Sequence, residues 1–85
     1  MITPPEAKVI DRSYLECVNK VSKKFYELTM FLTGNTYTVV CEYGRIGCNN
    51  PIIQTKYQGD DKITATDCFN KIHRQKIEKG YTPTQ

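Results

Sequence analysis

Residues 25–45 read FYELTMFLTGNTYTVVCEYGR, two alternating apolar runs joined by Gly34-Asn35. Successive residues of an extended chain point to opposite faces, so residues 25–32 and residues 37–45 each predict a strand with one face for a core. A Gly-Asn pair between such runs favours a two-residue hairpin turn, because glycine adopts the positive φ that the turn needs. The stretch therefore predicts an antiparallel strand pair on which the fold is built.

Further strands are expected on both sides of this pair. Residues 9–18 form a plausible first strand, and residues 52–57 read as a fourth after the break at Cys48-Asn49-Asn50-Pro51. Pro51 lacks a backbone donor and restricts Asn50 to extended geometry, which ends the preceding strand. Residues 58–61, QGDD, predict a turn. The sheet is thus expected to be antiparallel, with about four strands.

One helix is expected to follow, beginning between residues 61 and 64 and ending at Gly80. Aspartates favour its start, and Thr64 with Asp67 suggests a reciprocal cap. At about 100° per residue, four apolar positions form one stripe along the helix, namely Ala65, Cys68, Phe69 and Ile72. This stripe should pack across the sheet, which predicts an α+β fold. Lys76 continues that stripe, so it must lie along the sheet's rim or meet a partner.

The 85 residues suffice for one domain with a thin core. We expect an N-terminal tail at 1–8, the domain at 9–82 and a C-terminal tail at 83–85. No apolar stretch approaches the roughly 20 residues that span a membrane, and residues 1–5, MITPP, show no signal-peptide pattern. These features predict an intracellular protein, in the bacterial cytoplasm or in a nucleus.

The four cysteines, at 17, 41, 48 and 68, have no metal-ligand spacing with one another or with His73. We interpret them as free thiols, largely buried, and expect no metal or cofactor. His73 is expected to pack rather than to catalyse, because no nucleophile–base pair is recognisable beside it in the sequence. An enzyme with a small-molecule substrate is not predicted.

The net charge of +3 lies entirely in the second half, where residues 44–85 hold seven basic and four acidic side chains. This half begins within Tyr43-Gly44-Arg45-Ile46-Gly47. An aromatic ring can stack, a guanidinium can bind phosphate or carboxylate, and a glycine allows another backbone to approach. Together they predict a binding edge, to which Lys56 and Lys76 add charge.

Each candidate residue also has a structural interpretation. Tyr43 can be the last core aromatic of its strand, and Arg45 can form an ion pair with Glu42 or Glu27. Gly44 and Gly47 can serve only to shape a turn, and Lys56 can be ordinary surface. Lys71 and Arg74 are weaker candidates, because each lies four residues from an acid on the helix.

The chain resembles the WGR domain, which is named after a Trp-Gly-Arg motif. KFYEL at 24–28, YGRIG at 43–47 and QTK at 54–56 are similar to the family's strands, and the helix and its exit match at Ala65, Phe69, Arg74, Lys76 and Gly80-Tyr81. The family's fold is a small antiparallel sheet with one helix packed across it. Tyr43 stands where the family has Trp, and the loop 48–53 is longer and poorer in glycine.

The resemblance implies a non-catalytic module, found in DNA-dependent poly(ADP-ribose) polymerases and in free-standing bacterial proteins, that takes part in DNA repair. In the polymerases the motif's aromatic stacks on the sugar of a terminal nucleotide. For this chain it implies DNA-end or nick binding, independent of sequence, through Tyr43, Gly44, Arg45, Gly47, Lys56 and Lys76. The alternative is a protein-docking module that uses the same Tyr-Gly-Arg edge.

Overall fold

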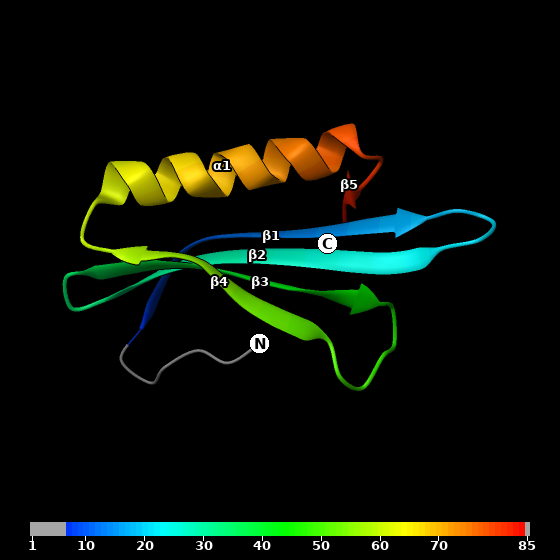
Figure 1. The fold of residues 1–85 in the computed structure, drawn as a ribbon, viewed down its shortest axis with the longest axis horizontal. Coiled ribbons are helices and arrows are strands. Elements are labelled where there is room, and N and C mark those ends of the chain that lie inside the picture. Colours follow the sequence, from blue (N-terminus) through cyan, green and yellow to red (C-terminus); the bar gives the residue numbers. More distant parts are fainter. Residues whose placement is uncertain (1–6, 85) are drawn as a thin grey trace.

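A computed structural model describes residues 7–84 as one antiparallel sheet with the strand order β4-β3-β2-β1-β5 and a single helix, α1 (Figure 1). The elements are β1 (Lys8–Val18), β2 (Lys23–Thr33), β3 (Thr36–Arg45), β4 (Ile52–Gly59), α1 (Lys62–Glu78) and β5 (Thr82–Pro83). The predicted α+β fold is confirmed. Residues 1–6 and 85 of the expected tails lie outside the described residues, whereas Pro83 and Thr84 are paired with β1.

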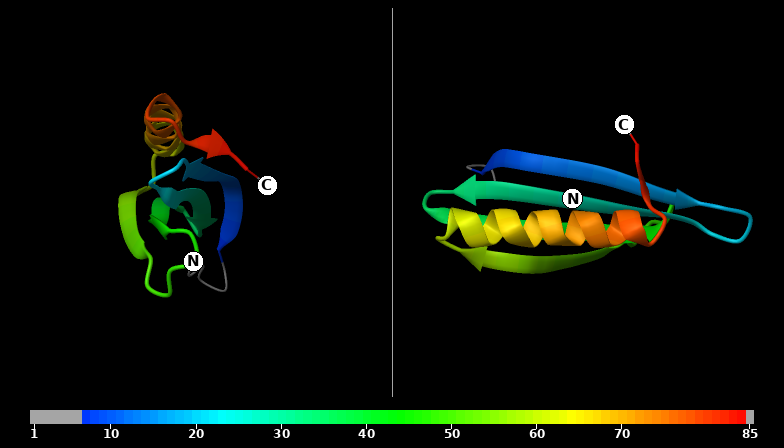
Figure 2. Two further views of the ribbon diagram at one scale, coloured as in Figure 1. Left: turned by 90° about the vertical axis from the view of Figure 1, so that its right-hand side faces the viewer. Right: turned by 90° about the horizontal axis from the view of Figure 1, so that it is seen from above.

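The helix lies along the central strands and covers one face of the sheet (Figures 1 and 2). The core between them is formed by alternate residues of β2 and β3, together with the apolar stripe of the helix. Its buried members are Leu15, Tyr26, Leu28, Met30, Val39, Cys41, Ala65, Phe69 and Tyr81. Cys68 and Ile72 pack against this core from the same stripe, as their spacing predicts.

The opposite face of the central strands is also largely buried, and the outer strands bend toward it (Figure 2). Thr29 and Phe31 of β2 and Thr38 of β3 are buried there. Glu27 is buried on the same face, where the guanidinium of Arg12 binds its carboxylate. This ion pair excludes Glu27 as the partner that the sequence offered for Arg45.

The β2–β3 hairpin has the expected two-residue turn. Thr33 pairs with Thr36, and Gly34 has a φ of +59° while Asn35 does not have a positive φ. That combination is typical of a type II′ turn, which places glycine at its first central position.

The fourth strand is longer than the sequence suggested. It continues through Gln58 and Gly59, which pair with Thr38 and Tyr37, so the expectation of a turn starting at Gln58 is wrong. A bulge at Lys56 accounts for the difference, since Tyr57 opposes Val39 while Thr55 opposes Val40. The fifth strand was missed because its two residues carry no alternating pattern.

The helix begins at Lys62 with Asp61 as its N-cap. A carboxylate oxygen of Asp61 accepts hydrogen bonds from the backbone N–H groups of Ile63 and Thr64, and the Thr64 hydroxyl donates to the other oxygen. These bonds lower the pKa of Asp61 below its usual value. The expected reciprocal cap of Thr64 and Asp67 is therefore wrong. The carboxylate of Asp61, three residues before Thr64, accepts from the free N–H groups at the start of the helix instead. Within residues 7–84 no helix has the length and apolar character needed to cross a membrane.

The packing of β2 against α1 is expected to contribute strongly to the stability of the domain. Leu28→Ala should lower the free energy of unfolding by about 2–5 kcal/mol, because Leu28 is fully buried at the centre of the core. Ile63→Ala is the matched control: its side chain is 74% exposed, and its effect should stay within about 0.5 kcal/mol. Urea unfolding measures both, and equal effects would contradict this description of the core.

Candidate functional site

Most of the predicted site residues meet at one end of the molecule. There β2 begins, β3 ends and α1 reaches its C-terminus, and we call this region the motif end (Figure 1). Tyr43, Gly44 and Arg45 finish β3, Gly47 lies in the loop that follows, and Lys76 lies in the last turn of α1. Lys56 lies apart, at the bulge within β4.

Tyr43 is half-buried and stacks on Tyr26, with ring centroids 5.4 Å apart and an angle of 18° between the planes. Tyr26 is a core residue directly opposite Tyr43 on β2. One face of the Tyr43 ring is therefore part of the packing. The structural interpretation of Tyr43 is confirmed to that extent, and its partial exposure leaves part of the side chain accessible.

Lys76 lies over two aromatic rings. Its Nζ is 4.5 Å from the ring centroid of Tyr26 and 5.7 Å from that of Tyr81. The helix end produces this arrangement: Tyr81 N–H donates to the Lys76 carbonyl and Gly80 N–H to the Ile77 carbonyl, with Gly80 at a φ of +103°. That is a Schellman motif, which brings the side chain after the glycine against the one at Lys76.

Lys24 adds a second cation, with its Nζ 5.6 Å from the ring centroid of Tyr81. We call Tyr26, Tyr43, Tyr81, Lys24 and Lys76 the tyrosine–lysine cluster. Burial lowers the pKa of Lys76, and the charge of Lys79 lowers it further. Burial also raises the pKa of Tyr26, which keeps that ring neutral beneath the Lys76 ammonium group.

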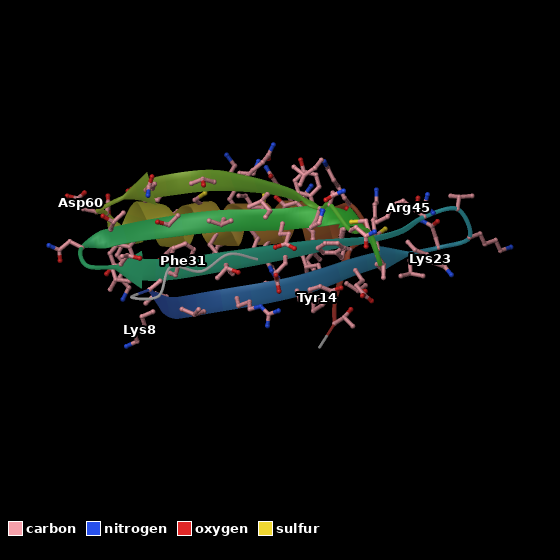
Figure 3. All side chains as sticks on the ribbon, turned by 90° about the horizontal axis from the view of Figure 1, so that it is seen from below. Lys8, Tyr14, Lys23, Phe31, Arg45 and Asp60 are labelled. Atoms are coloured by element: carbon pink, nitrogen blue, oxygen red, sulfur yellow. The ribbon has the colours of Figure 1, made fainter. Side chains whose placement is uncertain are left out.

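Arg45 is exposed and lies opposite Lys24 at the end of the β2–β3 ladder (Figure 3). Together with Lys23 and Lys24 it lines a small cavity of about 150 Å³, completed by Val21 and Ser22. Three cations around one hollow make this part of the motif end suited to an anionic ligand.

The two glycines have different roles. Gly47 has a φ of +86°, which other residues rarely adopt, and it shapes a turn in which Cys48 N–H donates to the Arg45 carbonyl. Gly44 allows that turn to fold back on β3, because a Cβ built there would lie 2.9 Å from Cys48 Sγ. Ile46 N–H donates to the Lys23 carbonyl and fastens the turn to β2. The turn-shaping interpretation of both glycines is thus confirmed.

Lys56 is exposed on β4. Its charge adds to the lowering of the pKa of Lys76. Burial raises the pKa of Cys68, and the charge of Lys56 offsets part of that rise. It therefore extends the positive potential from the motif end along the helix side of the sheet.

Sequence reasoning missed two members of the cluster as site residues. Tyr26 was identified only as part of a strand pattern, and Tyr81 only as part of a helix exit. The alternation of side chains along a strand could have indicated part of the cluster. Lys24 and Tyr26 lie on the same face of the sheet as Tyr43, which is in the neighbouring strand.

The structure also brings Ser13 and His73 together, 60 residues apart in the chain, with Ser13 Oγ 2.9 Å from His73 Nδ1. A cavity of about 560 Å³ adjoins Ser13 and is lined by Arg12, Tyr14, Pro83 and Thr84. Within residues 7–84 no carboxylate is hydrogen-bonded to His73, so the third member of a catalytic triad is missing there. We interpret the Ser13–His73 bond as a link between α1 and β1.

In a comparison with known protein families, residues 11–85 match the family model of the WGR domain. Neither a curated protein nor a solved structure matches the chain.

The close approach at Gly44 predicts a coupling between two positions. Gly44→Ala should lower the free energy of unfolding more when Cys48 is present than in a Cys48→Ala background, by about 0.5–1.5 kcal/mol. The reason is that the new methyl group forces the Cys48 thiol from its rotamer. Urea unfolding of the two single variants and the double variant measures this difference. Additive effects would show that Cys48 does not set the need for glycine.

The burial of Lys76 predicts a titration below the ordinary lysine value of 10.5. Lys79→Gln should raise the pKa of Lys76, since it removes a positive charge that lowers that pKa. At pH values between the lowered pKa of Lys76 and 10.5, the Lys76 side chain is protonated in the unfolded chain and has lost its proton in the folded chain. Lys76 therefore contributes stability that rises with pH across that window. NMR titration of the Lys76 side chain tests this, and a pKa at or above 10.5 would contradict it.

Proposed function

The chain belongs to the WGR domain family, and on that premise we propose that it binds DNA ends or nicks, independent of sequence and without catalysis. The observation that supports this most is the motif end itself. There Lys24 and Lys76 lie over the rings of Tyr81 and Tyr26, and the half-buried Tyr43 stacks on Tyr26. Arg45 lines a hollow beside them with Lys23 and Lys24. Such a surface suits a sugar–phosphate chain that ends in an accessible ring.

In this proposal Arg45 contacts a phosphate and Tyr43 offers the exposed part of its ring to a terminal sugar. Lys76 and Lys56 contribute longer-range attraction, while Gly44 and Gly47 hold the turn that presents Arg45. Tyr43 is smaller than the Trp of the family motif, but its stack on Tyr26 holds the ring in one orientation, which reduces the entropy lost on binding.

The distribution of charge around the motif end favours a polyanion. Residues 17–26 and 43–59 contain no acidic side chain. These two segments supply Lys20, Lys23, Lys24, Arg45 and Lys56. Contacts of this kind are made to phosphate and carry no base information, so binding should be independent of sequence and sensitive to salt.

A protein-docking function for the same edge is the second candidate. It is favoured by the packed face of Tyr43, which limits the ring area left for stacking, and by the modest net charge of +3. In either case we propose that the chain acts inside the cell, in a bacterial cytoplasm or in a nucleus. Neither function requires a small-molecule substrate.

Binding to nicked duplex DNA tests the proposal. Tyr43→Leu, which keeps an apolar side chain against Tyr26, should weaken binding by about 1–3 kcal/mol, the range for one stacked contact. Arg45→Ala should reduce the slope of log affinity against log salt by about 1. Fluorescence anisotropy at two salt concentrations measures both.

Arg74→Ala is the matched control, because it removes the same charge from an exposed helix position. It should change affinity less than Arg45→Ala. Failure of the unmodified chain to bind nicked, intact or single-stranded DNA at tens of micromolar and low salt would refute the proposal. A protein partner that is lost with Arg45→Ala, and retained after nuclease treatment, would favour docking.

A further inference from the structure

The loop between β1 and β2 carries an exposed apolar side chain at its tip. Val21 is 90% exposed. The loop is nevertheless held by hydrogen bonds, because the side-chain carbonyl of Asn19 accepts from the backbone N–H groups of Val21 and Ser22, and Asn19 N–H donates to the Ser22 carbonyl. Val21 is thus presented to solvent on an organised turn.

This hairpin tip, residues 18–22, projects past the end of the helix (Figure 2). Val18 at its base is 59% exposed. Within residues 7–84 no other element covers the tip, and its apolar side chains do not contribute to the core. The fold alone therefore gives no reason for valine at position 21.

The tip is surrounded by positive charge. Val21 lines the same cavity of about 150 Å³ as Ser22, Lys23, Lys24 and Arg45. Figure 3 shows Lys23 and Arg45 together at the base of the loop, at the end opposite to Lys8 and Asp60. An apolar side chain and a cationic hollow are therefore adjacent.

We propose that the hairpin tip is a wedge, in which Val21 enters the base stack of DNA where a nick interrupts one strand, while Lys23, Lys24 and Arg45 hold the neighbouring phosphate. This inference rests on the proposed DNA binding and specifies how a nick would be distinguished from intact duplex. Apolar side chains inserted between base steps open the stack. A nick lowers the cost of opening because one backbone no longer constrains the step.

The position of the tip favours DNA over an anionic lipid surface, which would also attract an apolar tip with lysines. The cations that line the hollow include Arg45 of the proposed DNA site, so the wedge and that site form one continuous surface.

The test uses the full chain and a dumbbell duplex, closed by loops at both ends, with or without one nick. A 2-aminopurine base beside the nick reports unstacking. The unmodified chain should bind the nicked form more tightly and raise the 2-aminopurine fluorescence. Val21→Ser should weaken binding to the nicked form about tenfold, from the loss of one buried valine, leave the intact form unchanged and abolish the fluorescence rise.

Two variants make the result specific. Val21→Ile keeps an apolar wedge and should retain both the nick preference and the fluorescence rise. Ile63→Ser changes another exposed apolar residue, at the start of α1 and so at the other end of the helix from the motif end, and should have no effect. Thermal unfolding of each variant checks that the fold is retained.

Each remaining outcome has a defined meaning. If Val21→Ser binds and unstacks the nick like the unmodified chain, while Tyr43→Leu and Arg45→Ala weaken binding, the wedge is refuted and the proposed function stands. If the unmodified chain binds none of the DNA forms, both are refuted. If Val21→Ser loses binding only to vesicles of phosphatidylglycerol and phosphatidylcholine, the tip contacts lipid and the wedge is refuted.

Discussion

The packing of the α1 stripe on β2 and β3 is the constraint on which the other features depend. Phe69 and Ala65 are buried against the central strands, which aligns the helix with them and fixes where it ends. The helix ends beside the last residues of β3, so the Schellman motif at Gly80 places Lys76 and Tyr81 against Tyr26. A helix crossing the strands at another angle would separate the lysine from the tyrosines.

The sequence correctly predicted the strands and the helix that have strong periodicity. The predictions failed for features that depend on contacts between residues distant in the chain. The β2–β3 pair and the helical stripe follow from local alternation and spacing, and Gly34 and Gly80 from local backbone geometry. The bulge at Lys56 and the two-residue strand β5 depend on pairing with distant strands, which a local pattern does not encode. The Asp61 cap was missed because two plausible capping residues lie within one turn.

For the candidate site, sequence reasoning found the motif residues but not their surroundings. Tyr43 was expected either to stack on a ligand or to finish the core. The structure shows an intermediate arrangement, in which Tyr26 occupies one face and part of the ring is exposed. The contribution of Tyr81 required the helix end and the start of β2 to meet in space. A binding surface built on core aromatics gains rigidity from the packing, and it couples any change in that packing to the site.

The central claim is that the motif end is the DNA-binding surface. Its most direct test is a map of backbone amide chemical shifts as nicked duplex is added to the isotopically labelled chain. The account predicts that the largest changes fall in residues 19–24, 43–48 and 76–81, with little change around the Gly34 turn and the start of α1 at the opposite end. Changes confined to that opposite end, or to the Arg12–Tyr14 cavity beside β5, would contradict it.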